Sequence, residues 1–381
     1  MPDPEIAYFD NNATTALDPR VLEAMLPWLR DHHGNPSSTH RFGREARRAV
    51  EEARRQVADL VGGRSAEVVF TASGTEANNA VLFGAAARWQ DRGHFVLSAF
   101  EHPSVIEAVE RLERRGMTAT RIQPRADGVL AAEDLSRALR PDTRVLCLML
   151  ANNELGTLQP VAEVAARCRR QGVLVLCDAV QAAGKAEIDV GPLGIDYLVL
   201  GGHKFHGPLG AAALWIRPGA PFEPWLAGAP QEAGRRPGTE NVPAVVGLGA
   251  ACEWARVELE KRREHLLSLR TRLEEGLGRL EGVRLHCTAS PRLPHTTNAA
   301  FLGASARHLV PALDAAGFAV SAGAACGAGK AEPSPTLKAL GLEDEEALAS
   351  LRISFGMGNR KEEVDAFLAA LPGILAGLRA G

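Results

Sequence analysis

The sequence predicts an α/β protein with a large doubly wound domain, built on a mostly parallel sheet, and a smaller α/β domain at its C-terminal end. Three patterns predict this fold. Short, nearly all-apolar runs alternate with helical stretches over residues 65–217, which is typical of parallel strands buried on both faces. One or two long amphipathic helices are expected over 243–279. A second α/β pattern over 298–318 and a final helix after Asn359 then form the smaller domain.

Six apolar runs in the first part are expected to be strands, because each is short and bounded by turn-forming residues. They are residues 68–70, 95–97, 145–150, 173–176, 197–200 and 211–216. Helical patterns over 101–115 and 161–171 lie between them. This strand–helix alternation is the pattern of a sheet with helices on both faces.

The composition restricts the class of protein. The 381 residues are 46% hydrophobic and 23% charged, which is ordinary for a soluble globular enzyme, and they are enough for two domains. The net charge of −3 gives no reason to expect nucleic acid or an anionic membrane as a partner. The first residues form no secretory signal, and no apolar run reaches the roughly 18 residues of a membrane-spanning helix. A cytoplasmic protein is therefore expected.

Polar residues directly after the apolar runs are the candidates for a functional site, because ligands of doubly wound folds bind beyond the carboxyl ends of the strands. Five runs end in such residues, which are 71–76, Glu101 with His102, 152–154, 178–181 and 201–204. A purely structural sheet more often ends in plain turn residues. The strand ends are therefore expected to form one site.

Lys204 follows one of these runs, with His203 before it and glycines around it that allow the backbone to approach a bound group closely. A desolvated lysine has a lowered pKa and can form a Schiff base with a carbonyl compound. Two alternatives stay open for this motif. A lone lysine on a loop is more often a surface residue with its amine in water. His203 and His206 have the spacing of half a metal site, although no other His/Cys cluster completes it.

Asp178 directly follows the apolar run 173–177. A pyridinium nitrogen stays protonated only beside a carboxylate, so a site for pyridoxal 5′-phosphate needs such a residue. The alternative for a lone aspartate after a strand is a helix N-cap, whose side chain accepts hydrogen bonds from the first backbone N–H groups of the next helix.

Residues 70–79 combine a strand end, a turn of small residues and a helix start. The free N–H groups and the dipole of a helix start attract anions, so Gly74 and Thr75 are candidates to hold a phosphate. In the alternative, Ser73 or Thr75 caps the helix and no ligand binds there.

His102 and Asn153 follow two further strands. The histidine ring could stack on a planar cofactor ring, and the asparagine amide could hydrogen-bond a ring substituent. Alone, each is more often an ordinary loop or turn residue. With Lys204, Asp178 and the phosphate-binding turn, however, they supply the parts that pyridoxal 5′-phosphate needs, all at one edge of the predicted sheet.

As a set, these motifs resemble those of the cysteine desulfurases of the NifS/IscS type, which are fold-type I enzymes dependent on pyridoxal 5′-phosphate. The resemblance runs nearly end to end. Besides the strand-end motifs, it rests on residues 9–15, 34–40, 236–241, 321–326, 332–334 and 351–354. It implies a large cofactor-binding domain at 15–257 and a small domain, at 1–14 with 258–381, that carries a catalytic cysteine loop.

The resemblance also implies roles for individual residues. Lys204 matches the Schiff-base lysine, Asp178 the partner of the pyridinium nitrogen, and His102 the stacking histidine, which also shuttles protons at the substrate sulfur. Cys326 matches the sulfur acceptor. The family has two groups, which differ in the length of the loop that carries this cysteine, and the loop here has the length typical of the longer one. The other matches are Gln181 and Asn153 near the ring hydroxyl, Gly74, Thr75 and His203 around the phosphate, Thr239 reaching in from the second subunit of a homodimer, and Arg352 with Asn153 on the substrate carboxylate.

Three departures from the family pattern concern the phosphate site. Gly201 stands where the family usually has serine, residues 71–75 read Thr-Ala-Ser-Gly-Thr, and Pro237 replaces a small residue. Losing one charge-assisted hydrogen bond costs about 1.5–3 kcal/mol. Because Gly201 lacks the serine hydroxyl, we expect the cofactor to bind about ten- to a hundredfold more weakly than it would with a serine at this position.

The implied reaction converts L-cysteine into L-alanine and leaves the sulfur as a persulfide on Cys326. The sulfur would then pass to an acceptor such as an iron–sulfur scaffold protein or a tRNA thiolation enzyme. Alternatives with the same cofactor are a selenocysteine lyase, a cysteine sulfinate desulfinase, and a transaminase or kynureninase-like lyase, of which the last two need no Cys326. A non-catalytic scaffold of the same fold is the alternative outside the enzymes, favoured only by the altered phosphate loop.

Overall fold

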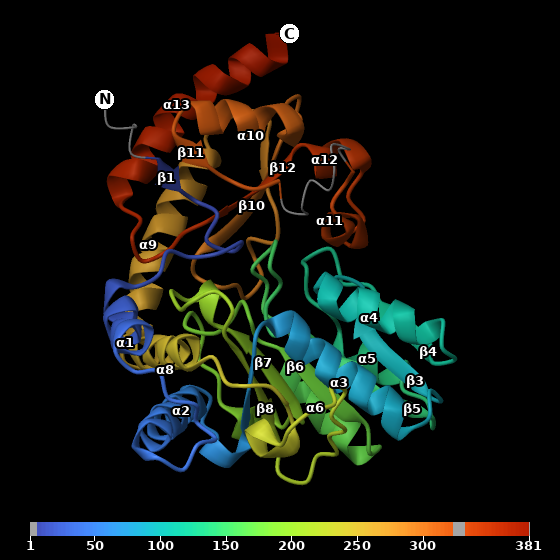
Figure 1. Ribbon diagram of the computed structural model, residues 1–381. Coiled ribbons are helices and arrows are strands. Elements are labelled where there is room, and N and C mark those ends of the chain that lie inside the picture. Colours follow the sequence, from blue (N-terminus) through green and yellow to red (C-terminus); the bar gives the residue numbers. More distant parts are fainter. Residues whose placement is uncertain (1–5, 323–331, 381) are drawn as a thin grey trace.

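The computed structural model describes residues 6–322 and 332–380, which form two packed parts (Figure 1). The larger part holds a seven-stranded sheet between helices. The smaller part, drawn above it, holds the first strand together with the C-terminal third of the chain. Cys326 lies outside the described residues. No described helix has the length and apolar character needed to cross a membrane.

The large sheet has the strand order β2-β8-β7-β6-β5-β3-β4 and is parallel except for β8, which pairs antiparallel with both of its neighbours. Its strands are β2 (Val68–Thr71), β3 (His94–Ser98), β4 (Thr118–Ile122), β5 (Thr143–Cys147), β6 (Leu174–Asp178), β7 (Tyr197–Gly201) and β8 (Ala212–Ile216). Each of the six predicted runs is a strand of this sheet, so the mostly parallel α/β fold is confirmed. The sequence missed β4, because this edge strand is at most half-buried and is not an apolar run.

Helices cover both faces of the sheet, and alternate residues of each strand point to opposite faces. On β3, Phe95 and Leu97 pack into one hydrophobic cluster, whereas Val96 between them packs into another. The covering helices are α3 (Gly74–Arg88) and α4 (Pro103–Glu113) on the first face, and α2 (Arg41–Leu60), α5 (Ala132–Arg137), α6 (Val161–Arg170) and α8 (Val242–Val257) on the second. Burial on both faces explains why nearly every strand residue is apolar.

The smaller part contains a three-stranded antiparallel sheet in the order β12-β10-β9, and a parallel pair of β1 with β11. These strands are β1 (Ala7–Tyr8), β9 (Val283–Leu285), β10 (Thr296–Phe301), β11 (Phe318–Ala319) and β12 (Ser350–Ser354). Its helices are α9 (Leu259–Leu277), α10 (Ala306–Ala315), α11 (Pro335–Ala339), α12 (Asp344–Leu348) and α13 (Lys361–Ala380). Phe9, Phe301, Phe355 and Phe367 are fully buried in its core.

The long helical stretch predicted over 243–279 is two helices that meet at Glu258. Buried side chains of α8, such as Leu248, belong to the cluster beneath the large sheet. Those of α9, such as Leu273, belong to the core of the smaller part. The domain boundary expected at 257–258 stays a prediction.

The remaining short elements connect these layers. They are α1 (Pro19–Arg30), which packs against α8, α7 (Val190–Leu193), and the 3₁₀ helices η1 (Ser65–Glu67), η2 (Gly202–Lys204) and η3 (Gln231–Gly234). Residues 9–15 cross between the two parts. Asp10 bridges to Ser354 of β12, and the Thr15 N–H donates to the His203 carbonyl at 2.9 Å. This segment therefore joins β12 to the carboxyl end of β7.

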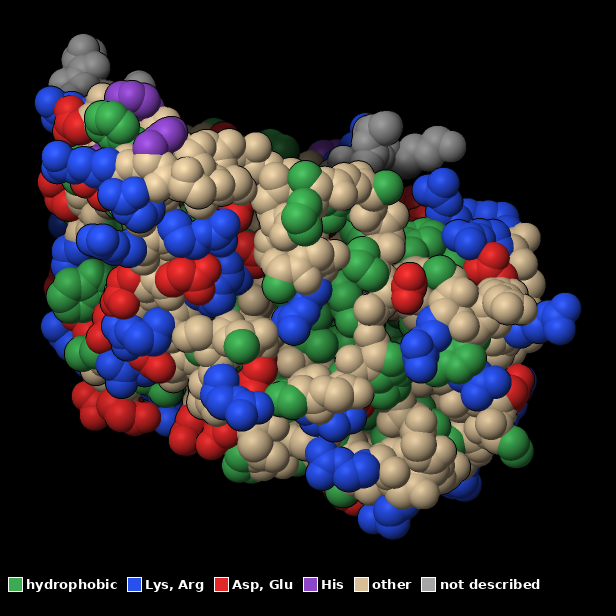
Figure 2. Space-filling view, turned by 60° about the horizontal axis from the view of Figure 1, so that its bottom comes forward, with side chains coloured by type: hydrophobic (Ala, Val, Ile, Leu, Met, Phe, Trp, Pro, Cys, Tyr) green, Lys and Arg blue, Asp and Glu red, His purple; other side chains and the backbone are tan. Residues whose placement is uncertain are grey.

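The surface carries charges of both signs. Figure 2 shows one face, on which Lys and Arg side chains are interspersed with Asp and Glu rather than gathered into a single basic patch. On α2, exposed charges pair along the helix, as Arg41 does with Glu45 and Arg55 with Glu52. Solvent screens such exposed pairs, so each contributes little to stability. They therefore favour the helix slightly and indicate no ligand.

Candidate active site

A pocket of about 540 Å³ opens between the two parts, at the carboxyl ends of β2, β3, β5, β6 and β7. This volume is within the range of small-molecule sites. Of the predicted site residues, its wall contains Gly74, Thr75, His102, Asn153, Asp178, Gln181, His203, Lys204 and Arg352. Residues that the sequence analysis did not single out also line it, among them Asn12, Ser104, Met149 and Thr336. Strand ends far apart in the chain thus meet in one place.

Among the predicted site residues that the structure describes, Thr239 is not in this wall. Thr239 is exposed and lies on a separate shallow groove with Pro237 and Gly238. Its expected role in the site of a second subunit therefore stays a prediction. The predicted sulfur acceptor, Cys326, lies outside the described residues.

Lys204 lies at the end of η2, directly after β7, and its side chain reaches into the pocket. The Nζ atom donates to the carbonyl oxygens of Asn12 at 2.6 Å and of Ala13 at 2.8 Å. Burial and then the positive charge of Arg352 lower the pKa of Lys204 to about 8. An appreciable fraction of the amine is therefore unprotonated near neutral pH, as a nucleophile or base requires.

Asp178 is the last residue of β6 and is buried in the pocket wall. Its Oδ2 accepts from the Asn78 amide at 2.8 Å, and its Oδ1 accepts from the Val180 N–H at 3.0 Å. The residues after it form turns rather than a helix, so Asp178 is not a helix N-cap. Asn78, on α3, also donates to Ser104 Oγ at 3.0 Å, and the sequence analysis missed this link.

The proposed phosphate turn lies at the start of α3. Ser73 is the N-cap, and its Oγ accepts from the Glu76 N–H at 3.1 Å, as the capping alternative expects. The N–H groups of Gly74 and Thr75 precede the first intrahelical bond, so no acceptor within the helix is available to them. Both residues line the pocket, and the positive end of the α3 dipole points there. Capping and anion binding are therefore compatible at this helix.

His102 is the N-cap of α4. Its Nδ1 accepts from the Ser104 N–H at 3.1 Å and lies 2.8 Å from Ser104 Oγ. Because the backbone N–H occupies Nδ1, the neutral ring carries its proton on Nε2. Burial lowers the pKa of His102, opposed in part by the nearby Asp178 charge. The ring is thus both a satisfied cap and part of the pocket wall.

His203, which was predicted beside the phosphate, also lies in the wall. Its Nδ1 is 3.2 Å from Thr14 Oγ1. Burial, followed by the charge of Lys204, lowers the pKa of His203 to about 4, so the ring is neutral at physiological pH. His206 points elsewhere, with its Nδ1 2.9 Å from the Ala16 carbonyl. The two histidines therefore do not converge as a metal site would require.

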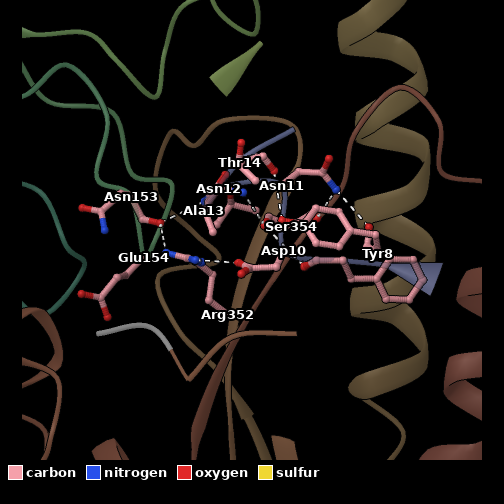
Figure 3. Close-up of polar contacts among 12 residues, drawn as sticks. Tyr8, Asp10, Asn11, Asn12, Ala13, Thr14, Asn153, Glu154, Arg352 and Ser354 are labelled. Carbon is pink, nitrogen blue, oxygen red and sulfur yellow. Dashed lines mark hydrogen bonds and ion pairs between the residues drawn. The ribbon is translucent and has the colours of Figure 1, made fainter. Parts of the chain in front are cut away.

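Arg352 on β12 is buried and lines the pocket, and Figure 3 shows its guanidinium between Asp10 and Asn153. Its Nη2 donates to Asp10 Oδ1 at 2.7 Å and its Nη1 donates to the Asn153 carbonyl at 3.2 Å, while its buried Nε has no acceptor among the described residues. The side-chain amide of Asn153 points away from the guanidinium (Figure 3). The sequence singled out Arg352 but missed Asp10, which holds it.

Glu101 is a further pocket residue that the sequence analysis noted only as polar. Its Oε1 accepts from Ser98 Oγ at 2.6 Å and from the Met149 N–H at 2.8 Å, so it ties β3 to the segment after β5. Burial raises the pKa of Glu101 to about 7. No pattern in the sequence distinguishes such a buried carboxyl group from an exposed one.

Five of the six cysteines lie among the described residues. Cys147, Cys168, Cys177 and Cys252 are buried, Cys287 is half-buried, and none of these five lines the pocket wall. Burial raises the pKa of each thiol, to about 12 for Cys168 and about 11 for Cys287. Because the thiolate is the reactive form, burial makes these five thiols weak nucleophiles.

The residues present fit pyridoxal 5′-phosphate. A Cβ at Gly74 would lie only 2.9 Å from Val180 Cγ2, so the phosphate turn accommodates no larger residue without a shift. The turn offers N–H donors, Asp178 offers a buried carboxylate, and Lys204 offers an amine with a lowered pKa. These are the groups that hold the phosphate, the ring nitrogen and the aldehyde of this cofactor.

Comparison with known proteins agrees with this geometry. The family model described as "Aminotransferase class-V" matches residues 7–367. The chain belongs to this family. Among curated relatives, a cysteine desulfurase of Cereibacter sphaeroides is 43% identical over 379 residues, which are 99% of this chain and 97% of the relative. The cysteine desulfurase IscS of Methanosarcina thermophila is 40% identical over 373 residues, which are 98% of this chain and 92% of the relative.

Solved structures are similar as well. A NifS-like protein superposes with a TM-score of 0.92 at 35% identity and covers 98% of this chain and 100% of its own. The NifS-like protein of Rickettsia africae has a TM-score of 0.88 at 30% identity, and the match covers 97% of this chain and 99% of that protein. The predicted resemblance, the fold class and the dependence on pyridoxal 5′-phosphate are therefore confirmed. The predicted function as a cysteine desulfurase is confirmed at the level of the family.

Proposed function

We propose that this enzyme takes the sulfur of L-cysteine onto Cys326 as a persulfide and releases L-alanine. In this reaction the Cβ–Sγ bond of the substrate breaks, an S–S bond forms at Cys326, and hydrogen replaces sulfur on Cβ. The observation that carries the proposal is the convergence of Lys204, Asp178, His102 and Arg352 on one pocket. The relatives named cysteine desulfurase support the choice of substrate.

The cofactor supplies an electron sink, because its protonated ring accepts the electron pair released at the substrate Cα. Asp178 keeps the proton on the ring nitrogen. Its own two oxygens are held by the Asn78 amide and the Val180 N–H, so the carboxylate is fixed in place. The N–H groups of Gly74 and Thr75 would hold the phosphate, and the neutral ring of His203 would assist them.

Lys204 binds the cofactor and moves the proton at the substrate Cα. With its pKa lowered to about 8, it exchanges protons near neutral pH. His102 would stack on the ring and would carry a proton at the substrate sulfur through Nε2, because Nδ1 is occupied by the Ser104 N–H. Arg352, whose buried side chain lines the pocket, binds the substrate carboxylate through its guanidinium charge.

The partners follow from the same resemblance. We propose a homodimer in which Thr239 of each subunit completes the phosphate site of the other, since Thr239 is exposed and outside its own pocket. The sulfur acceptor would be an iron–sulfur scaffold protein or a tRNA thiolation enzyme, and the cytoplasm the location. The family resemblance and the sequence support the homodimer, the class of sulfur acceptor and the location.

The test mixes cofactor-supplemented protein with L-cysteine without reductant and measures alanine by chromatography and sulfur on the Cys326 peptide by mass spectrometry. One alanine per site, with one added sulfur on Cys326, is expected. Cys326→Ala should lose the added sulfur, whereas Cys287→Ala, which removes a cysteine away from the pocket, should keep it. Alanine formed at the wild-type rate by Cys326→Ala in a single turnover would contradict the acceptor role, and normal turnover by Lys204→Ala would contradict the role of that lysine.

A further inference from the structure

Lys185 is a buried amine that the proposed mechanism does not use. It lies behind Gln181 and is 4% exposed. Its Nζ donates to the Gln181 carbonyl at 3.1 Å and to Gln181 Oε1 at 3.4 Å. Among the residues that the structure describes, no carboxylate forms an ion pair with it. A buried lysine without a counter-ion is costly as a cation, so its protonation state needs an explanation.

The surroundings of Lys185 favour the uncharged amine. Burial, followed by the positive charges of Lys204, Arg352 and Arg262, holds its pKa well below the usual range. The other titratable groups that interact with it are imidazoles rather than carboxylates, namely His203, His206 and His295. A neutral amine has two N–H donors, and Gln181 supplies two acceptors for them. An ammonium group would leave one donor unsatisfied in the interior.

Gln181 has a defined amide orientation as a consequence. Its Nε2 donates to the Asn12 carbonyl at 3.0 Å, while its Oε1 accepts from Lys185. Turning the amide over would place Oε1 against the Asn12 carbonyl, so two acceptors would meet, and would leave Lys185 without its side-chain acceptor. The Asn12 carbonyl also accepts from Lys204 at 2.6 Å. The chain from Lys185 through Gln181 to Asn12 therefore ends at the lysine of the site.

We propose that Lys185 is a positioning residue, which holds the Gln181 amide so that its second N–H, rather than its oxygen, faces the pocket and the ring oxygen of the cofactor. Gln181 is in the pocket wall, whereas Lys185 is not. The inference rests on the proposed function, because it assumes that the cofactor binds at Lys204. It adds a residue behind the wall that controls how the ring oxygen is stabilised.

The measurement is a pH titration of the visible absorption band of the cofactor bound to Lys204. An N–H donor stabilises the deprotonated ring oxygen and so lowers the pH at which the lysine linkage loses its proton. Lys185→Met keeps the apolar length of the side chain and removes both donors. We expect the titration midpoint of this variant to rise by about one pH unit, the size of one hydrogen bond to a charged group.

Gln181→Leu is the matched variant. It should raise the midpoint by a similar amount, and adding Lys185→Met to it should change nothing further, because Lys185 acts through Gln181. A structural role alone would alter the thermal unfolding temperature of Lys185→Met and leave the midpoint unchanged. If the methionine variant does not fold, Lys185→Leu, with a shorter apolar chain, gives the same comparison.

The outcomes separate this inference from the proposed function. A visible band in the wild type whose midpoint is the same in the folded Lys185 variant would overturn the inference alone. Additive shifts in the double variant would also overturn it, since Lys185 would then act by another route. Failure of the wild-type protein to form a visible band with the cofactor would overturn the proposed function and this inference with it.

Discussion

Gly201 offers the sharpest test of how this pocket binds its cofactor. It is the last residue of β7, and its backbone is extended, with φ −133° and ψ 113°, so any residue can adopt its conformation. A Cβ placed there would lie 3.2 Å from Val180 Cγ1 and 3.9 Å from His203 Cδ2. Both neighbours line the pocket. The substitution Gly201→Ser would therefore direct a hydroxyl group to the phosphate side of the site.

The magnitude follows from two opposing terms. A hydroxyl that donates to a phosphate oxygen contributes about 1.5–3 kcal/mol. The 3.2 Å approach to Val180 is tighter than an ordinary contact and requires a shift of a few tenths of an ångström, which costs about 1 kcal/mol. The net gain of about 0.5–2 kcal/mol corresponds to roughly 2- to 30-fold tighter binding of the cofactor.

The assay titrates cofactor-free protein with pyridoxal 5′-phosphate and follows the visible band to obtain Kd. Gly201→Ala is the control, because it adds the Cβ and its contact with Val180 but no hydroxyl. We expect the serine variant to bind more tightly than the wild type and the alanine variant to bind equally or more weakly. Serine and alanine variants with the same Kd would refute the reasoning, since the hydroxyl would then make no contact with the phosphate.

Two further predictions concern charge. In the cofactor-free protein the amine of Lys204 should titrate near pH 8. Arg352→Gln should raise that midpoint, because it removes a positive charge that helps to lower the pKa of Lys204. Amine labelling across pH, followed by mass spectrometry, measures the midpoint, and an unchanged midpoint in the variant would contradict the assigned cause. For stability, Glu232→Ala should lower the free energy of unfolding in urea by about 3–5 kcal/mol, because it leaves the buried guanidinium of Arg54 without its bidentate partner. Glu52→Ala, which removes an exposed ion pair screened by solvent, should cost far less, and equal losses from the two changes would contradict the argument from burial.

The fold could be predicted where hydrophobic patterns are strong. The strands of the large sheet are buried on both faces, so each is a short apolar run that the sequence displays directly. The edge strand β4 escaped prediction because its half-buried residues need not be apolar. Likewise, the break at Glu258 between α8 and α9 is set by which core each helix packs against, and helical periodicity alone does not show it.

The site could be predicted at the strand ends for a related reason. Parallel strands bring their carboxyl ends to one edge, so Lys204 and Asp178 were expected together before any contact was known. Their supporting residues were not expected. Asp10 lies 342 positions from Arg352 and Asn78 lies 100 positions from Asp178, and no local pattern marks either as a partner.

The sequence by itself therefore determined the α/β class, most strands and the candidate site residues at the strand ends, because these depend on local hydrophobic periodicity and on short motifs. Only the tertiary structure decided the charge states and orientations within the site. The lowered pKa of Lys204 depends on burial and on Arg352, and the direction of the Gln181 amide depends on Lys185 and Asn12. These properties come from distances between groups and from their removal from water, and both exist only once the chain has folded.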